Sequence, residues 1–436
     1  MFLISTIFII FVILALSMKR MHVIDTRQFL LVSLTLIALN NLIFPTYLLN
    51  GPIRQLIIFS MCFLIVAYTL FFKSLRLGHI RNYYVPITLI ILILLMMFLG
   101  LSITPSFSYG LSKFLRFLLY SFFPALCFFL LGPYTSKDKK IILLLVLSSA
   151  FIVAVMFFFN SIDYAGMNGR FSISQKIHPN NLSRNICIGM PICFSLFFSK
   201  RYSLPIRLLL IVIASFLLLS SLQTGSRGPI LAAIVALLFT IFSVFRIKNS
   251  IRIIVSFIFI VMSITFIGDK LNIKTIAGSQ ILRMYNLTTK LGGNSSDQQR
   301  LLRYEKAVDI FMSSNGLGVG TGGFMYHWIG PPPGGIEKKK EYPHNLILEF
   351  LSELGIIGFS LIISYILLLI INYYKHNRLK YNEMNNVFFC LWIYSFINSQ
   401  VSGDFASNYQ FWISSSLCFN MFNSTNDFIG NRKYGK

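Results

Sequence analysis

Four cationic side chains stand out because each lies in a short polar segment beside an apolar run. They are Arg170 in GRFSISQKIHPNN, Arg227 in TGSRGP, Arg300 in RLLRYEKAVDIF and His344 in EYPHNLILEFLSELGIIGF. The guanidinium group of arginine donates paired hydrogen bonds that match phosphate oxygens, and it stays charged in a partly dehydrated site. Histidine exchanges protons near neutral pH. These residues therefore predict a site that binds an anion and moves a proton.

Each of these side chains also has an ordinary structural alternative. Arg227 could anchor a helix end by extending its charge into water. Arg170 and Arg300 could lie on solvated surfaces, and His344 could cap a helix or lie on the surface. Two loop histidines are weaker candidates, His178 and His327.

The chain lacks the patterns that usually mark a metal or nucleotide site. It contains no Asp-x-Asp pair, Walker loop or zinc-type cluster of Cys and His. The Gly-Val-Gly within GLGVGTGG does not follow a strand of a βαβ unit, so it does not predict dinucleotide binding. We therefore expect no cofactor and no metal, and the pattern disfavours a nucleotide-sugar donor.

The elements that must position these residues are membrane helices. The chain has 436 residues, is 56% hydrophobic and has a mean hydropathy of +0.72. A bilayer core needs roughly 20 helical residues, and the apolar runs are continuous rather than alternating. We predict an all-α polytopic membrane protein with about 12–13 transmembrane helices. The candidate spans are residues 2–17, 28–49, 55–72, 83–103, 117–133, 141–159, 186–198, 208–222, 230–245, 253–268, 347–373, 387–402 and 411–422.

Loop charges predict the orientation of these helices. Positive charge is retained on the cytoplasmic side of short loops. Seven alternate segments carry three Lys or Arg each, namely 19–27, 73–82, 134–140, 199–207, 246–252, 375–386 and 423–436. The N-terminus is then periplasmic, the C-terminus is cytoplasmic, and the long segments 160–185 and 269–346 lie outside. This gives three regions: helices 1–10 within 1–268, a partly helical periplasmic loop domain at 269–346, and helices 11–13 with a cytoplasmic tail at 347–436.

Composition also excludes a nucleic-acid partner, despite a net charge of +24. The Lys and Arg residues are dispersed in short loops rather than gathered in a basic stripe on a soluble face. The basic residues in the outer segments instead favour an anionic ligand. All six cysteines fall within apolar runs, so we expect no structural disulfide.

The long outer loop should contain a helix over 296–313. Leu301, Leu302, Tyr304, Ala307, Val308 and Phe311 supply an apolar face at helical spacing. The glycine-rich segment 316–323 should end this helix in a turn. A second helical run should start at His344 and continue straight into the span 347–373.

Four blocks resemble the O-antigen polymerase and ligase superfamily. They are GRFSISQKIHPNNLS, TGSRGPILA, RLLRYEKAVDIFMSSNGLGVGTGGF and PHNLILEFLSELGIIGF, in the order found in that family. Tyr304 departs from the pattern, because relatives often have Trp there. The resemblance implies a metal-independent glycosyltransferase with a GT-C-like membrane fold. Its donor would be an oligosaccharide on undecaprenyl pyrophosphate.

The same resemblance implies roles for individual residues. Arg170, Arg227 and Arg300 would contact the donor pyrophosphate, and His344 would lie near the acceptor hydroxyl. Of these, His344, Arg227 and Arg300 are the expected catalytic residues. The expected substrate-binding residues are Arg170, Arg303 and Asn345, the last two of which lie close in sequence to the catalytic residues.

We interpret the chain as an O-antigen polymerase of the bacterial inner membrane, acting in lipopolysaccharide biosynthesis. An O-antigen ligase, which transfers the glycan to lipid A core, is the alternative with the same donor. A polysaccharide flippase fits less well, because transporters tend to carry ionisable residues near the bilayer midplane and repeated halves. Expected partners are membrane lipid and the lipid-linked oligosaccharide, with a chain-length regulator left open.

Overall fold

A computed structural model describes residues 26–43, 59–67, 83–163, 170–173, 177–199, 201–244, 296–330, 341–379 and 382–423. The predicted spans 2–17 and 253–268 lie outside these ranges. The described part is helical apart from one antiparallel pair of two-residue strands, β1 (Ile162–Asp163) and β2 (Phe171–Ser172). Residues 59–67 are also helical. The other helices are α2 (Thr26–Ile43), α5 (Tyr84–Leu99), α6 (Phe107–Phe117), the π-helical turn η1 (Leu118–Phe122), α7 (Phe123–Leu131), α8 (Ser136–Asn160), α9 (Pro179–Cys187), α10 (Gly189–Phe197), α11 (Leu204–Gln223), α12 (Arg227–Val244), α15 (Ser296–Ser313), α16 (Gly323–Ile329), α17 (Leu346–Leu379), α18 (Glu383–Val401) and α19 (Tyr409–Asn423).

Four of the described helical stretches are long and apolar enough to cross a membrane. Large apolar side chains are also exposed along α5 and α11, including Leu95, Phe98, Leu209 and Val212. An apolar surface of this extent suits lipid rather than water. The predicted helical membrane architecture is therefore confirmed, while the number of crossings remains a prediction. The four stretches are Phe107–Leu131, Ser136–Asn160, Leu204–Gln223 and Leu346–His376.

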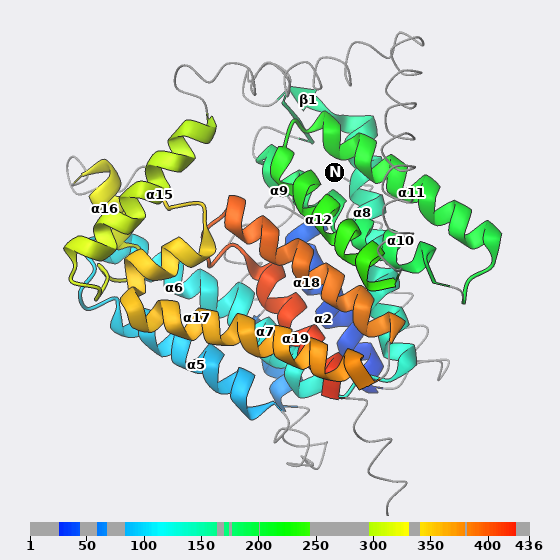
Figure 1. Cartoon of the computed structure of the whole chain (residues 1–436), viewed down its shortest axis with the longest axis horizontal. Helices are drawn as coiled ribbons and strands as arrows, with labels where there is room; N and C mark the ends of the chain where they lie inside the picture. Colours follow the sequence, from blue (N-terminus) through cyan, green and yellow to red (C-terminus); the bar gives the residue numbers. More distant parts are fainter. Residues whose placement is uncertain are drawn as a thin grey trace, which may run out of the picture.

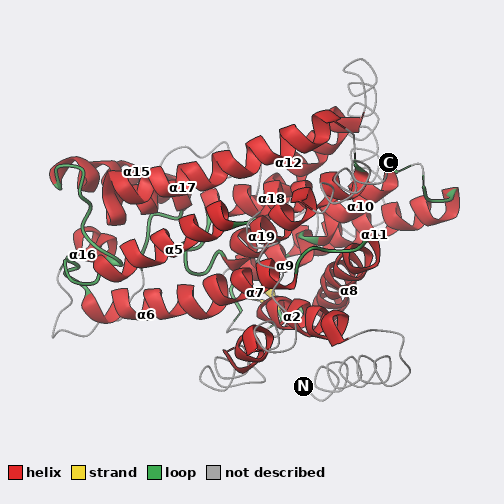
Figure 2. Cartoon of the chain, turned by 90° about the horizontal axis from the view of Figure 1, so that it is seen from below, coloured by secondary structure: helices red, strands yellow, loops and turns green. Residues whose placement is uncertain are grey.

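The centre of the bundle consists of α18 and α19, which pack against each other (Figure 1 and Figure 2). Nearly every described residue of α19 is buried. Trp412 of α19 contacts the rings of Phe117 and Phe350, which come from α6 and α17. Both views place α15 and α16 together at one end of the bundle. The helices of the predicted outer loop therefore adjoin the membrane helices instead of forming a detached domain.

The helix predicted at 117–133 begins ten residues earlier than expected. Its first part, α6, starts at Phe107 and buries Tyr109, Lys113 and Phe117. Hydropathy missed α6 because its buried face includes a lysine, and serine, glycine and arginine residues interrupt its apolar residues. The turn η1 then joins α6 to α7 without a break. Single π-turns inside α-helices are frequent at functional sites.

The expectation of a straight helix from His344 through 373 is wrong. α17 consists of two helical parts that meet at a sharp kink, where Gly355 has φ 64° and ψ −159°. A side chain at this position would overlap the backbone of Gly316 and Leu317. The second part is long enough by itself to span a bilayer core of roughly 20 residues.

The glycine-rich segment 316–323 closes around this kink. The amide groups of Val319 and Gly320 donate to the carbonyls of Ser352 and Glu353, at 3.1 and 2.9 Å. On the far side of the kink, the amide of Ile356 donates to the carbonyl of Gly316 at 2.9 Å. The first two bonds satisfy carbonyls, and the third satisfies an amide, that the two helix ends at the kink leave free. The segment is therefore a cap for the break in α17 as well as the turn after α15.

The helix predicted at 296–313 is present as α15, and it packs against α17. Its buried face differs from the predicted one. Ala307 and Ile310 pack with Phe324 of α16, whereas Leu301, Leu302 and Val308 are exposed.

Candidate active site

The first part of the site lies at the start of α9. Arg170 immediately precedes β2, and the hydroxyl of Ser172 in β2 donates to the carbonyl of Ile177 at 2.7 Å. That bond holds the short strand against the residue before His178. The Nδ1 atom of His178 accepts from the amide of Asn180 at 3.2 Å, so His178 caps α9. The segment thus brings Arg170 and His178 to one helix end.

The start of α12 joins the same region through one hydrogen bond. The hydroxyl of Ser226 donates to the side-chain oxygen of Asn180 at 2.8 Å. Arg227 is the next residue and begins α12, half-buried. The bond therefore places the first turns of α9 and α12 side by side, with Arg227 at their junction.

Two arginines reach the site from α15. Arg300 is half-buried, whereas the two residues before it are exposed. Arg303 forms an ion pair with Glu341, 2.9 Å between Nη2 and Oε2, and its guanidinium lies 5.1 Å from the ring centroid of Trp328. The contacts of Arg303 fasten α15 to α16 and to the segment before α17.

His344 lies directly before α17 in an uncommon backbone conformation. Its φ is 63°, in the left-handed region that costs a non-glycine residue about 1–3 kcal/mol. Asn345 caps α17, because its side-chain oxygen accepts from the amide of Leu348 at 3.0 Å. Its side-chain nitrogen donates to the carbonyl of Gln400 at 3.3 Å. The capping role considered for His344 therefore belongs to Asn345, which positions the histidine.

Tyr304 strengthens this arrangement. Its hydroxyl donates to the same carbonyl of Gln400, at 3.3 Å. One carbonyl at the end of α18 thus joins α15 to the start of α17. Tyr304 therefore ties α15 to the end of α18 by a hydrogen bond.

Positive charge surrounds the imidazole of His344. Burial, followed by the charges of Arg303, Arg300 and Arg184, lowers its pKa to about 3, while Asp404 opposes them. Its Nδ1 atom is buried and has no hydrogen-bond partner among the described residues. His344 is therefore a neutral imidazole at pH 7, with one ring nitrogen unpaired.

The pKa of His178 is affected by an overlapping group of cations. Loss of hydration lowers its pKa to about 4 although part of the ring stays exposed, and Arg170, Arg184 and Arg300 contribute. Arg184 and Arg300 thus act on both histidines. The fold brings together Arg170, Arg300, Arg303 and His344, which lie up to 174 positions apart, and links Arg227 to them through Asn180.

Arg184 was not among the predicted residues. It is 6% exposed, and its Nη1 donates to the side-chain oxygen of Asn408 at 3.0 Å. Its Nη2 donates to the carbonyls of Asn398, at 2.9 Å, and Ser402. These partners are all neutral. The position just after the PNNLS block was the only sequence feature that pointed to Arg184.

His327 lies apart from this group. It is exposed on α16 beside Tyr326, and its pKa is lowered by partial burial and by Lys306 rather than by the arginines of the site. The structure therefore separates the two histidines of the long loop, His327 and His344.

Acidic side chains near the site are already paired with cations. Asp404 contacts Arg116 at 2.9 Å, and Glu353 contacts Lys113 at 2.7 Å. Burial raises the pKa of Asp404, but Arg116, Lys113 and hydrogen bonds from Ser407 outweigh it, so the pKa lies below its usual value. In the described part of the chain, no three His, Cys, Asp or Glu side chains form a group that could hold a metal ion.

The arrangement suits a reaction in which a hydroxyl loses a proton beside a bound anion. Arginines on three separate elements can neutralise charge on phosphate oxygens. The neutral imidazole of His344 can accept a proton, and its pKa rises once an anion offsets the surrounding cations.

Comparison with known proteins identifies one matching family. The family model described as O-antigen ligase matches residues 209–363. The matched region includes Arg227, Arg300, Arg303, His344 and Asn345. A search of curated proteins finds no match. Members of the matched family are glycosyltransferase-like enzymes that act on lipid-linked glycans. This part of the chain is therefore similar to the O-antigen ligase and polymerase superfamily.

Proposed function

We propose that the protein is an O-antigen polymerase. It joins oligosaccharide repeat units carried on undecaprenyl pyrophosphate, at the periplasmic face of the inner membrane. The observation that supports this most strongly is the convergence of Arg170, Arg184, Arg300 and Arg303 on the neutral histidines His178 and His344.

The reaction follows from the roles of these side chains. The acceptor hydroxyl attacks the anomeric carbon of the donor, and the bond from that carbon to the pyrophosphate oxygen breaks. His344 takes the proton of the hydroxyl, a contribution of typically about 10²- to 10⁴-fold. The departing lipid pyrophosphate gains negative charge, which Arg227, Arg300 and Arg170 stabilise. Loss of one such preorganised donor typically costs about 10²- to 10³-fold in rate.

The neutral state of His344 is consistent with this role. In the free protein, burial together with the nearby arginines lowers its pKa to about 3, which makes it a weak base. A bound pyrophosphate brings negative charge to the same arginines and raises that pKa. Histidine therefore becomes a better proton acceptor only when the donor is present.

Arg303 and Asn345 have supporting roles in this proposal. Arg303 is paired with Glu341, and Asn345 caps α17. Both hold neighbouring catalytic residues in place, and any substrate contact they make is secondary.

The donor is activated by its pyrophosphate, so the reaction needs neither a nucleotide nor a metal. Within the described residues the buried carboxylates near the site are committed to Lys113 and Arg116. We expect polymerisation by the purified protein to survive a strong chelator. Complete loss of activity that magnesium restores would contradict a metal-independent mechanism.

Ligation is the second candidate, because the matching family model is described as O-antigen ligase. Both reactions use the same donor and differ in the acceptor. A deletion strain separates them on a lipopolysaccharide gel. Core bearing one repeat unit supports polymerase, whereas bare core with free lipid-linked polymer supports ligase. Repeat units trapped in the cytoplasm would instead identify a flippase and overturn both.

A further inference from the structure

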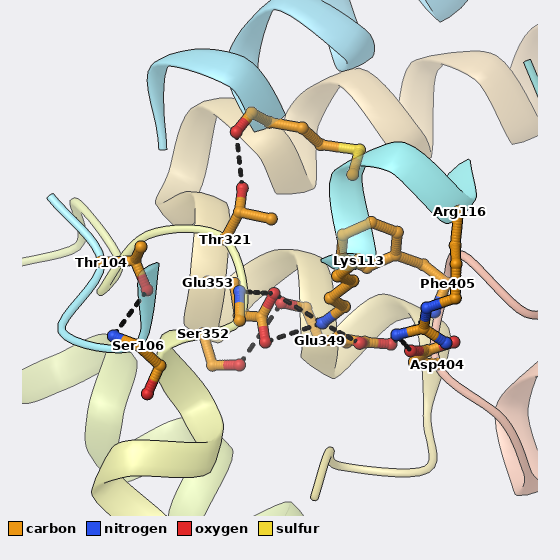
Figure 3. Close-up of polar contacts among 12 residues, drawn as sticks. Thr104, Ser106, Lys113, Arg116, Thr321, Glu349, Ser352, Glu353, Asp404 and Phe405 are labelled. Atoms are coloured by element: carbon orange, nitrogen blue, oxygen red, sulfur yellow. Dashed lines mark hydrogen bonds and ion pairs between the residues drawn. The ribbon is translucent and has the colours of Figure 1, made fainter. Parts of the chain in front are cut away.

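A buried lysine and two buried glutamates meet beside the kink in α17 (Figure 3). The Nζ atom of Lys113 on α6 lies 2.8 and 2.7 Å from the two carboxylate oxygens of Glu353. It also forms an ion pair with Glu349. All three side chains are 0% exposed.

Such a cluster is a poor source of stability. Burial of charges costs free energy that ion pairing roughly offsets, so replacement by apolar residues is often neutral or stabilising. Buried polar groups are better known for selecting one arrangement of the elements that carry them. We therefore expect this cluster to fix the relative positions of α6 and α17.

Lys113 aligns the first part of α17. Glu349 and Glu353 are four residues apart and thus lie on one face of that short helix. Glu353 also accepts from the amide of Gly322 at 2.9 Å, in the glycine-rich segment. The helix begins immediately after His344 and Asn345. Its position determines where the histidine lies.

Arg116 lies one helical turn further along α6 and aligns a different segment. It pairs with Asp404 in the loop 402–408 between α18 and α19, as Figure 3 shows. Asp404 also accepts from the amide of Ser407 at 2.7 Å. The same loop supplies Asn408 and Ser402, two of the acceptors that hold Arg184.

Further contacts join the two halves. The amide of Phe405 donates to Glu349 at 2.8 Å, and the ring of Phe405 lies 4.3 Å from the Nζ atom of Lys113. In η1, the hydroxyl of Ser121 donates to the carbonyl of Ala406 at 3.2 Å. One continuous helical stretch, 107–131, therefore supports both the start of α17 and the loop 402–408.

We propose that Lys113 and Arg116 are positioning residues of the transfer reaction. Lys113 fixes His344 through Glu349 and Glu353, and Arg116 fixes Arg184 through Asp404 and its loop. Together they set the separation between the proton acceptor His344 and Arg184, one of the cations whose charge acts on it. This inference rests on the proposed function.

The test compares Lys113→Met with Arg116→Met in purified protein reconstituted in lipid nanodiscs. Affinity is measured with undecaprenyl pyrophosphate, and turnover with lipid-linked repeat units, or with lipid A core if the wild type ligates. Lys113→Met should lower kcat by about 10²-fold, the cost of a displacement of about 1 Å, with lipid pyrophosphate affinity unchanged. Arg116→Met should weaken that affinity as well. Lys139→Met, which removes another buried lysine at the start of α8, is the control and should behave as wild type.

Lys113→Met leaves two buried carboxylates without a counter-charge and could fail to fold. The variant K113M/E349Q/E353Q removes all three charges and is expected to fold. It should bind lipid pyrophosphate normally and still turn over at least about tenfold more slowly, because neutral side chains no longer impose one position on α17. Normal turnover by this variant would show that the cluster is only structural and would overturn the inference. Failure of the proposed function would instead be visible in the wild type, as the absence of both polymer and ligated product.

Discussion

The ring of His344 lies against the ring of Tyr342 in an edge-to-face arrangement, with 4.4 Å between the ring centroids. Burial, with the nearby Asp404, raises the pKa of Tyr342, so its hydroxyl stays protonated. The contact leaves the imidazole held by an aromatic neighbour and by backbone geometry rather than by a carboxylate. Its charge state therefore depends on the surrounding arginines and on the ligand.

The first prediction concerns pH. The pKa of His344 is lowered to about 3, so acidification from about pH 8 to about pH 5 leaves the imidazole of the free protein neutral and able to accept a proton. The ratio kcat/KM, which reports the free enzyme, should show no acid limb from His344 in that range. In kcat, which reports the donor complex, the limb should appear at higher pH because the pyrophosphate raises the pKa. An acid limb of kcat/KM near 6.5 would show that burial and the surrounding cations do not lower the pKa of His344 in the free protein.

The second prediction concerns the kink in α17. At Gly355, φ is 64° and a side chain would overlap the backbone of the glycine-rich segment. Gly355→Ala should therefore destabilise the protein by more than about 4 kcal/mol, a loss typical of severe backbone conflict. Gly330→Ala is the matched control, since Gly330 has φ 79° but nothing within 4 Å of the added carbon. It should cost only about 1–2 kcal/mol for the left-handed conformation. Apparent melting temperatures in detergent check the difference, and equal shifts would rule out the role of the cap.

Hydropathy and loop composition predicted most of the helices, because an apolar run of sufficient length has few alternatives in a bilayer. The cationic site could also be anticipated, since its arginines and histidine fall in polar segments between those runs. Lys113 and Arg116 could not, because α6 mixes polar and apolar residues and lies outside any apolar window. The kink at Gly355 was missed for the opposite reason. The residues around Gly355 have the composition of an uninterrupted membrane helix. The break becomes apparent only from the contact with residues 316–320 in the structure.

The third prediction concerns orientation. Single cysteines introduced in 160–185 and 269–346 should react with a membrane-impermeant reagent in intact spheroplasts, and cysteines in 423–436 should not. The six native cysteines are buried and free, so their background labelling should be low. Labelling of the long loop only after the inner membrane is permeabilised would reverse the proposed topology.

The last prediction separates the roles of the arginines and the histidine. Lysine keeps the charge of arginine but loses the paired donors that match phosphate. Arg227→Lys and Arg300→Lys should therefore bind a lipid pyrophosphate analogue weakly and form little polymer. Both must reach the membrane in wild-type amounts, because loss of folding would mimic loss of chemistry.

The most direct measurement is analogue binding by His344→Ala, read alongside polymer length on a gel. His327→Ala, an exposed histidine on α16, is the control and should match wild type in both. We expect His344→Ala to form no polymer and yet to bind the analogue nearly as well as wild type, because the partner of His344 is the acceptor. If His344→Ala loses binding as severely as Arg227→Lys and Arg300→Lys, the histidine belongs to the pyrophosphate site and its proposed role in proton transfer is contradicted.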